Sequence, residues 1–170
     1  MQLRDLFDEM PVNPGAVIPL EIEQLLRSDL DVKEDWQQAE QLLLRARSAL
    51  PGQLEVLVAL YKLYAYSNRF DESLQIIDEV LLSAASTAGF DPDWRKLDSG
   101  SAAWRPASGA IRKYLYSLKA TGFVSLRRGD IDKAHQVLMK LQELDPQDQV
   151  GGSVVLEMAN SLLEALEDEA

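Results

Sequence analysis

The amino-acid sequence predicts an all-α protein in which three helical hairpins stack into a short solenoid. Apolar residues recur at intervals of three and four along most of the 170 residues, and no stretch alternates with the period of two that strands require. The pattern that runs through Ala39 and Leu43 returns 34 residues later at Ser73 and Ile77. Repetition at such a period is typical of stacked helical repeats. The apolar content of 46% suits one folded domain over residues 1–170.

Residues 1–19 are expected to form a short helix on a stiff tether. Leu3, Leu6, Phe7 and Met10 follow helical spacing, and three prolines then separate this segment from the first repeat. These apolar side chains are expected to be buried against another surface. We expect the segment to pack on the first hairpin as a cap, or alternatively to dock on a partner or on a second copy of the chain.

Each repeat pairs two amphipathic helices. Pro51 and Pro146 close the second helix of the first and third repeats, because proline lacks the backbone donor and clashes with the preceding turn. Turn residues separate the two helices of each pair. The hairpins are predicted at residues 20–52, 53–85 and 109–147, with first helices over 20–30, 54–66 and 110–128.

Small residues mark the place where the two helices of the third repeat cross. Gly122 and Ala134 occupy these positions, Gly129 marks the turn, and a proline ends the unit. The second repeat carries Tyr61 and Ser73 at the same two positions. Small side chains let two helix backbones approach closely. This pattern resembles the tetratricopeptide repeat, and the resemblance implies a right-handed solenoid whose concave face is lined by the first helices.

Residues 86–108 are expected to be an inserted loop between the second and third hairpins. The stretch is rich in Ser, Gly, Pro and Asp, and it contains Trp94 and Trp104. Irregular segments of this length are usually functional or disordered. We expect its tryptophans to pack onto the helical body; the alternative is that they form a second partner-binding surface. Residues 148–170 are predicted to form a C-terminal capping helix.

The composition excludes several kinds of site. Cysteine is absent, so there is no disulfide, thiol nucleophile or cysteine-based metal centre. The one histidine, His135, rules out paired-histidine metal sites. We expect no cofactor, no metal and no catalytic residues. The alternative, an enzyme, would have to work with carboxylates alone.

Net charge and hydropathy narrow the range of partners. The formal charge of -11 argues against nucleic acid as a partner, because no chain-wide phosphate-binding surface exists. No apolar run reaches the length of about 18 residues that suggests a membrane-spanning helix, and the start of the chain lacks the pattern of a secretory leader. We expect a cytoplasmic protein that does not bind membranes.

The concave face implied by the tetratricopeptide resemblance is basic and aromatic. Residues 94–142 contain ten basic and three acidic residues, an excess of seven within an otherwise acidic chain. We therefore expect this face to bind a protein or peptide with an acidic segment, and a homodimer remains open. The predicted partner-binding residues are Lys62, Tyr66, Tyr116, Lys119, Phe123 and Arg127, with Gln24 and Ser28 at the matching positions of the first hairpin.

Two narrower resemblances bear on function. In size, acidity and three-repeat layout the chain is similar to class II type III secretion chaperones, which would imply an export chaperone. The stretches LFDEMPVNPGAVIPLEIEQLL, KYLYSLKATGFVSLRRGDIDKA and DPQDQVGGSVV resemble small repeat proteins encoded among bacterial nitrogen-fixation genes. That second resemblance implies an accessory factor, or adaptor, that binds a nitrogenase component or a maturation protein.

Overall fold

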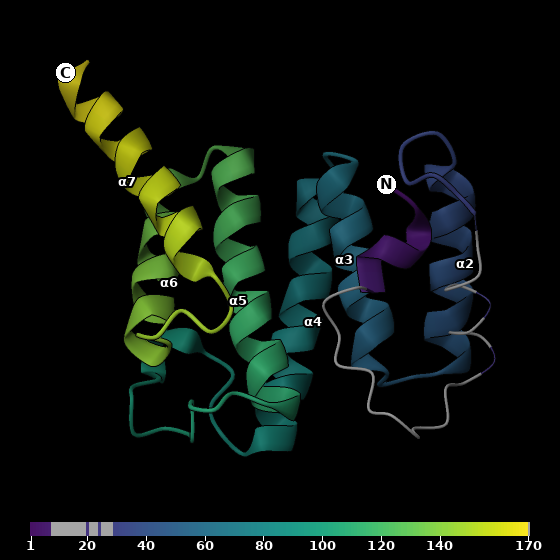
Figure 1. Ribbon diagram of the computed structural model, residues 1–170, viewed down its shortest axis with the longest axis horizontal. Coiled ribbons are helices and arrows are strands. Elements are labelled where there is room, and N and C mark those ends of the chain that lie inside the picture. The colour runs from purple at the N-terminus through teal and green to yellow at the C-terminus, as the bar shows by residue number, and fades with distance from the viewer. Residues whose placement is uncertain (8–19, 21–23, 25–28, 170) are drawn as a thin grey trace. The chain divides into compact units, whose positions relative to one another are not determined.

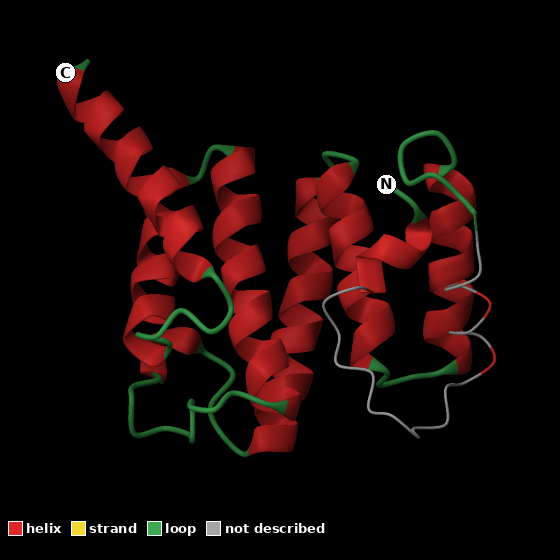
Figure 2. Cartoon of the chain, in the orientation of Figure 1, coloured by secondary structure: helices red, strands yellow, loops and turns green. Residues whose placement is uncertain are grey.

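The computed structural model describes residues 1–7, 20, 24 and 29–169, and the regular elements within them are helices (Figure 1). The all-α prediction is confirmed for this part of the chain, which Figure 2 shows as helices joined by loops. The one departure among the described residues is an isolated bridge between Gln2 and Asp31. The elements are η1 (Leu3–Phe7), α2 (Trp36–Ala49), α3 (Leu54–Tyr66), α4 (Phe70–Ala88), η2 (Trp94–Lys96), α5 (Gly109–Arg128), α6 (Ile131–Leu144) and α7 (Gly152–Asp168).

The chain divides into two compact units, Met1–Ile76 and Ile77–Ala170, with the boundary inside α4. A single repeat domain over the whole chain stays a prediction. The helices lie close to their predicted ranges, although α4 continues to Ala88 and shortens the insertion. Most of the helix predicted over residues 20–30 falls outside the described residues. Within this range, Leu20 and Gln24 are described and are helical. No helix that the structure describes has the length and apolarity to cross a bilayer.

In the first unit, the N-terminal segment packs on the protein's own helix α3, which belongs to the second predicted hairpin, whereas we expected it to pack on the first. Residues Leu3–Phe7 form a 3-10 helix rather than an α-helix, and the side chains of Leu3, Leu6 and Phe7 are buried. The Leu3 N–H donates to the carbonyl of Leu30 at 2.9 Å, and the Lys62 ammonium donates to the carbonyl of Leu6 at 3.2 Å. Apolar burial and backbone bonds therefore hold this segment in place; Met10 lies outside the described residues.

Arg69, in the turn between α3 and α4, ties the first unit together. Its guanidinium pairs with Glu40 of α2 and Glu72 of α4, and its central carbon lies 5.1 Å and 4.7 Å from the ring centroids of Trp36 and Tyr64. Burial, followed by the hydrogen bond to Glu40, raises the pKa of Tyr64 to about 12. The phenol therefore stays protonated through the physiological range.

The two helix crossings predicted from small residues use different contacts. At Gly122 of α5, an added Cβ would lie 2.6 Å from Cγ and Cδ2 of Leu138 in α6, so only glycine allows this approach. In the first unit, the buried hydroxyl of Ser73 donates to the carbonyl of Tyr61 at 2.8 Å. A hydrogen bond therefore joins α3 to α4 at the position where the third hairpin uses close packing.

The second unit places α5, α6 and α7 in successive contact. Gly129 ends α5 in the left-handed conformation with φ of 95°, as the predicted turn requires. The start of α7 presses on α6, since a Cβ at Gly152 would lie 2.5 Å from Cδ2 of Leu141. The side chains of Val155 and Leu156 are buried, as expected of a helix that covers the preceding one.

We expect Gly122→Ala to lower the free energy of unfolding by about 1–3 kcal/mol, because the new methyl group overlaps Leu138. The sign of this change tests the tight crossing, because a glycine-to-alanine substitution inside an uncrowded helix instead raises the free energy of unfolding by about 0.5–1 kcal/mol. Urea unfolding followed by circular dichroism measures the change. The control is the same substitution in a Leu138→Ala background, where the cost should shrink or change sign. Stabilisation by Gly122→Ala in the parent chain would contradict the tight crossing.

Candidate partner-binding site

Four predicted binding residues form one row along α5. Tyr116, Lys119, Phe123 and Arg127 share a side of the helix because they are spaced by three and four residues. The Lys119 ammonium lies 5.0 Å from the ring centroid of Tyr116, and the Arg127 guanidinium lies 5.9 Å from that of Phe123. Tyr116 and Phe123 are half-buried, and Arg127 is exposed. This α5 row therefore presents two rings, each with a cation against it.

Lys119 also has a structural contact that the sequence did not reveal. Its ammonium donates to the carbonyl of Val150 at 2.8 Å, in the loop that leads into α7. The lysine thus joins the middle of α5 to the start of the last helix. Within the α5 row, the exposed charge at the surface is that of Arg127.

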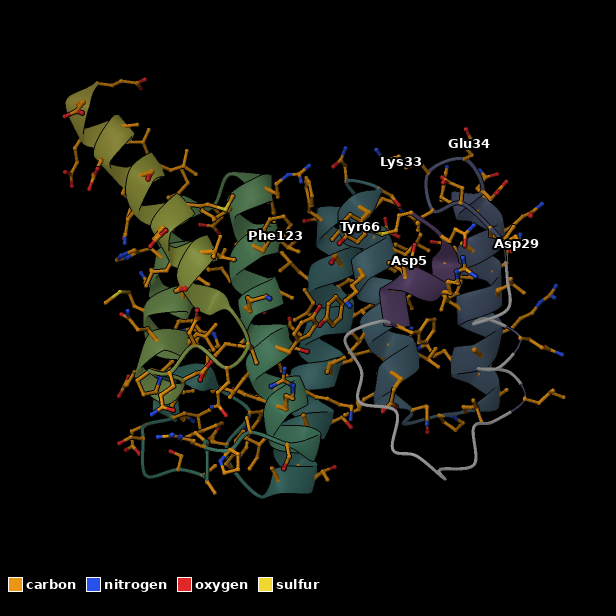
Figure 3. All side chains as sticks on the ribbon, in the orientation of Figure 1. Asp5, Asp29, Lys33, Glu34, Tyr66 and Phe123 are labelled. Carbon is orange, nitrogen blue, oxygen red and sulfur yellow. The ribbon has the colours of Figure 1, made fainter. Side chains whose placement is uncertain are left out.

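The binding residues predicted on α3 belong to the first unit. Figure 3 labels Tyr66 near the end of α3, where its side chain is 50% exposed. Lys62 instead donates to the carbonyl of Leu6 and holds the N-terminal segment. Gln24 is helical and exposed, and Ser28 lies outside the described residues. A groove formed jointly by the second and third hairpins stays a prediction.

Trp104 of the insertion is part of the core of the second unit. Its side chain is only 5% exposed, its ring centroid lies 5.1 Å from that of Phe90, and its indole N–H donates to the carbonyl of Asp98 at 2.9 Å. The Phe90 ring meets Tyr114 edge-on at 4.9 Å, and burial raises the pKa of the Tyr114 phenol. Trp104 therefore packs on the helical body, as expected, and leaves little of its side chain for a partner to contact.

Trp94 lies in a different environment, at an open depression of about 690 Å³ between η2 and α6. Its side chain is half-buried, and the Arg95 guanidinium lies 4.4 Å from its ring centroid. His135 and the exposed Met139 contribute to the lining from α6. Met139 is not among the residues predicted from the sequence, although its spacing from His135 places both on one side of the helix. No cluster of three metal-binding side chains occurs among the residues that the structure places.

The loop between α6 and α7 orders the insertion, which sequence reasoning did not anticipate. The buried carboxylate of Asp145 accepts hydrogen bonds from the backbone N–H groups of Gln149 and Val150 and from the side-chain amide of Gln149. That amide also donates to the carbonyl of Trp104 at 2.8 Å, while its oxygen accepts from the N–H of Ala107 at 2.8 Å. In the sequence, the one indication that this loop has a role was the stretch DPQDQVGGSVV, whose polar residues have no helical pattern.

The chain is similar in sequence to a known protein of similar size. It is 34% identical over 122 residues to an uncharacterized 19.8 kDa protein from the nifW 5′ region of Azotobacter chroococcum mcd 1. The aligned part covers 71% of this chain and 68% of the relative. The chain belongs to the family of that Azotobacter protein. No protein-family model and no solved structure match the chain.

We expect Trp104→Ala to destabilise the second unit by about 3–5 kcal/mol, because it leaves a cavity beside Phe90 and Tyr114. Trp94→Ala is the matched control and should cost about 1 kcal/mol or less, since its ring is only half-buried. Thermal unfolding followed by circular dichroism at 222 nm reports both without relying on tryptophan fluorescence. Equal losses for the two variants would contradict the separate assignments.

Proposed function

We propose that the protein is a non-catalytic accessory factor of nitrogen fixation that binds a partner protein. The observation that carries this proposal is the family relationship to the protein from the nifW 5′ region. The composition agrees with a binding role, because the one histidine and the absence of cysteine leave few groups for catalysis. A nitrogenase component or a maturation protein is the proposed partner.

We further propose that the hairpins are tetratricopeptide-type repeats. Two features support this assignment: the close approach of Gly122 to Leu138 and the bond between Ser73 and Tyr61. Both lie where the repeat pattern requires two helices to cross. In such repeats the first helix of each hairpin faces the ligand, which here assigns that role to α3 and α5.

The α5 row is the proposed contact surface for an acidic segment with an apolar anchor. Aromatic rings supply much of the affinity at protein interfaces, whereas exposed charges chiefly govern the rate of encounter and its salt dependence. Phe123 and Tyr116 would take the first role and Arg127 the second. Tyr66 and Lys62, in the first unit, stay predicted binding residues of α3.

The accessory role can be tested in Azotobacter chroococcum. We expect deletion of the relative's gene to lower acetylene reduction during growth on dinitrogen and to leave growth on ammonium unchanged. Expression of the present chain should restore activity, and a tagged copy should co-purify with a nitrogenase component or a maturation protein. Acetylene reduction at the parental rate in the deletion strain would contradict the proposed role.

With that partner in hand, the binding mode is tested by Arg127→Glu and Phe123→Ala in surface plasmon resonance. Arg127→Glu should slow association and reduce the binding free energy by about 0.2–1 kcal/mol. The difference from the parent should shrink as the salt concentration rises. Phe123→Ala should chiefly speed dissociation. Lys119 is left intact because it holds Val150.

The matched control is Arg45→Glu, an exposed charge reversal on α2. It should leave the interaction unchanged. If both α5 variants bind like the parent, the α5 row is not the contact surface, although the accessory role would be unaffected.

A further inference from the structure

We propose that the uncovered apolar face of α7 is a docking surface for a basic amphipathic helix of a partner protein. Four large apolar side chains define this α7 face: Val154, Met158, Leu162 and Leu166, which are 63%, 44%, 41% and 51% exposed. They follow one another at intervals of four residues, so they form a continuous row along the helix. The surface is separate from the α5 row, and its assignment does not depend on the function proposed there.

The second half of α7 has little packing of its own. The buried residues of the helix are Gly152, Val155, Leu156 and Ala159, all within its first half. Beyond Ala159, through residue 169, only Leu163 is even half-buried, and Figure 1 shows this part of α7 projecting past the ends of α5 and α6. Short helical stretches without tertiary packing are marginally stable in water. A contact along the apolar row would supply the missing packing.

The row of the α7 face matches a known mode of recognition. Large apolar side chains on neighbouring turns of one helix pack against apolar side chains that a second helix presents at intervals of three and four. A terminal helix that only seals a repeat array would instead carry a polar outer face. The geometry therefore favours a helical partner segment.

The negative charge of α7 favours a basic helix as the partner. Residues 151–170 contain no lysine or arginine, and their charged residues are Glu157, Glu164, Glu167, Asp168 and Glu169. Pairing α7 with a second copy of itself would bring acidic helices together. Carboxylates near a helix C-terminus are also unfavourable, because the helix dipole is negative there, and nearby cations offset both effects. The occupant is thus a basic helix rather than a second α7.

The test uses three synthetic peptides of 18 residues, each labelled with fluorescein, and fluorescence anisotropy with the full chain. The first has leucine at helical spacing among lysines, the second has the same pattern with glutamate in place of lysine, and the third is a scrambled lysine peptide. We expect the patterned lysine peptide to bind and the other two to bind much more weakly or not at all.

The double change Leu162→Ser and Leu166→Ser should weaken binding of the lysine peptide at least about tenfold, which corresponds to about 1.4 kcal/mol. Both positions are exposed, so the fold should persist in circular dichroism. The matched control, Leu44→Ser with Leu82→Ser, removes two exposed leucines from α2 and α4 and should bind like the parent.

Three outcomes would overturn the proposal. The lysine peptide fails to bind the parent chain, or it binds the α7 variant as tightly as the parent. In the third, light scattering finds a dimer that Leu162→Ser and Leu166→Ser dissociate, which assigns the face to a second copy. None of these results bears on the α5 row or on the phenotype in Azotobacter.

Discussion

The buried carboxylate of Asp145 is the constraint on which the order of the second unit depends. It lies at the end of α6 and accepts three N–H donors from Gln149 and Val150. A buried carboxylate without such donors would be strongly destabilising, so the loop has little freedom once α6 and α7 pack. The fixed loop then presents the Gln149 amide to the insertion and the Val150 carbonyl to Lys119. The insertion, α5 and α7 are therefore all tied to one side chain.

The helix crossings show how repeats of different sequence can meet one geometric requirement. Gly122 lets Leu138 approach the α5 backbone, and no hydrogen bond is needed there. At the crossing of α3 and α4, Tyr61 is too large for that solution, and the Ser73 hydroxyl bonds to its carbonyl instead. Apolar contact and a buried hydrogen bond are thus alternative ways to join two helices. This difference accounts for Tyr61 and Ser73 at the two positions where the third repeat carries Gly122 and Ala134.

The sequence predicted the helices well because apolar periodicity is a local property. The limits of α3 and the shared side of the α5 row follow from residue spacing alone. The packing of Trp104 was expected, but the hydrogen bonds that order the insertion could not be predicted. Trp104 and Tyr114 donate to the carbonyls of Asp98 and Pro92, and a carbonyl acceptor has no residue signature. For the same reason, the anchoring contact of Lys119 was not visible in its spacing. The apolar residues of the α7 face could be placed on a helix from their spacing, but their exposure depends on tertiary packing, which spacing does not give.

Three lysines make long-range contacts of the same kind, each donating to a backbone carbonyl. The pairs are Lys62 with Leu6, Lys119 with Val150 and Lys140 with Leu97. Every amino acid supplies a carbonyl, so replacement of the accepting residue need not break the bond. Such contacts create no pair of positions that must change together during evolution. Methods that infer spatial proximity from correlated substitutions would therefore overlook these three lysine contacts, although each joins segments far apart in the sequence.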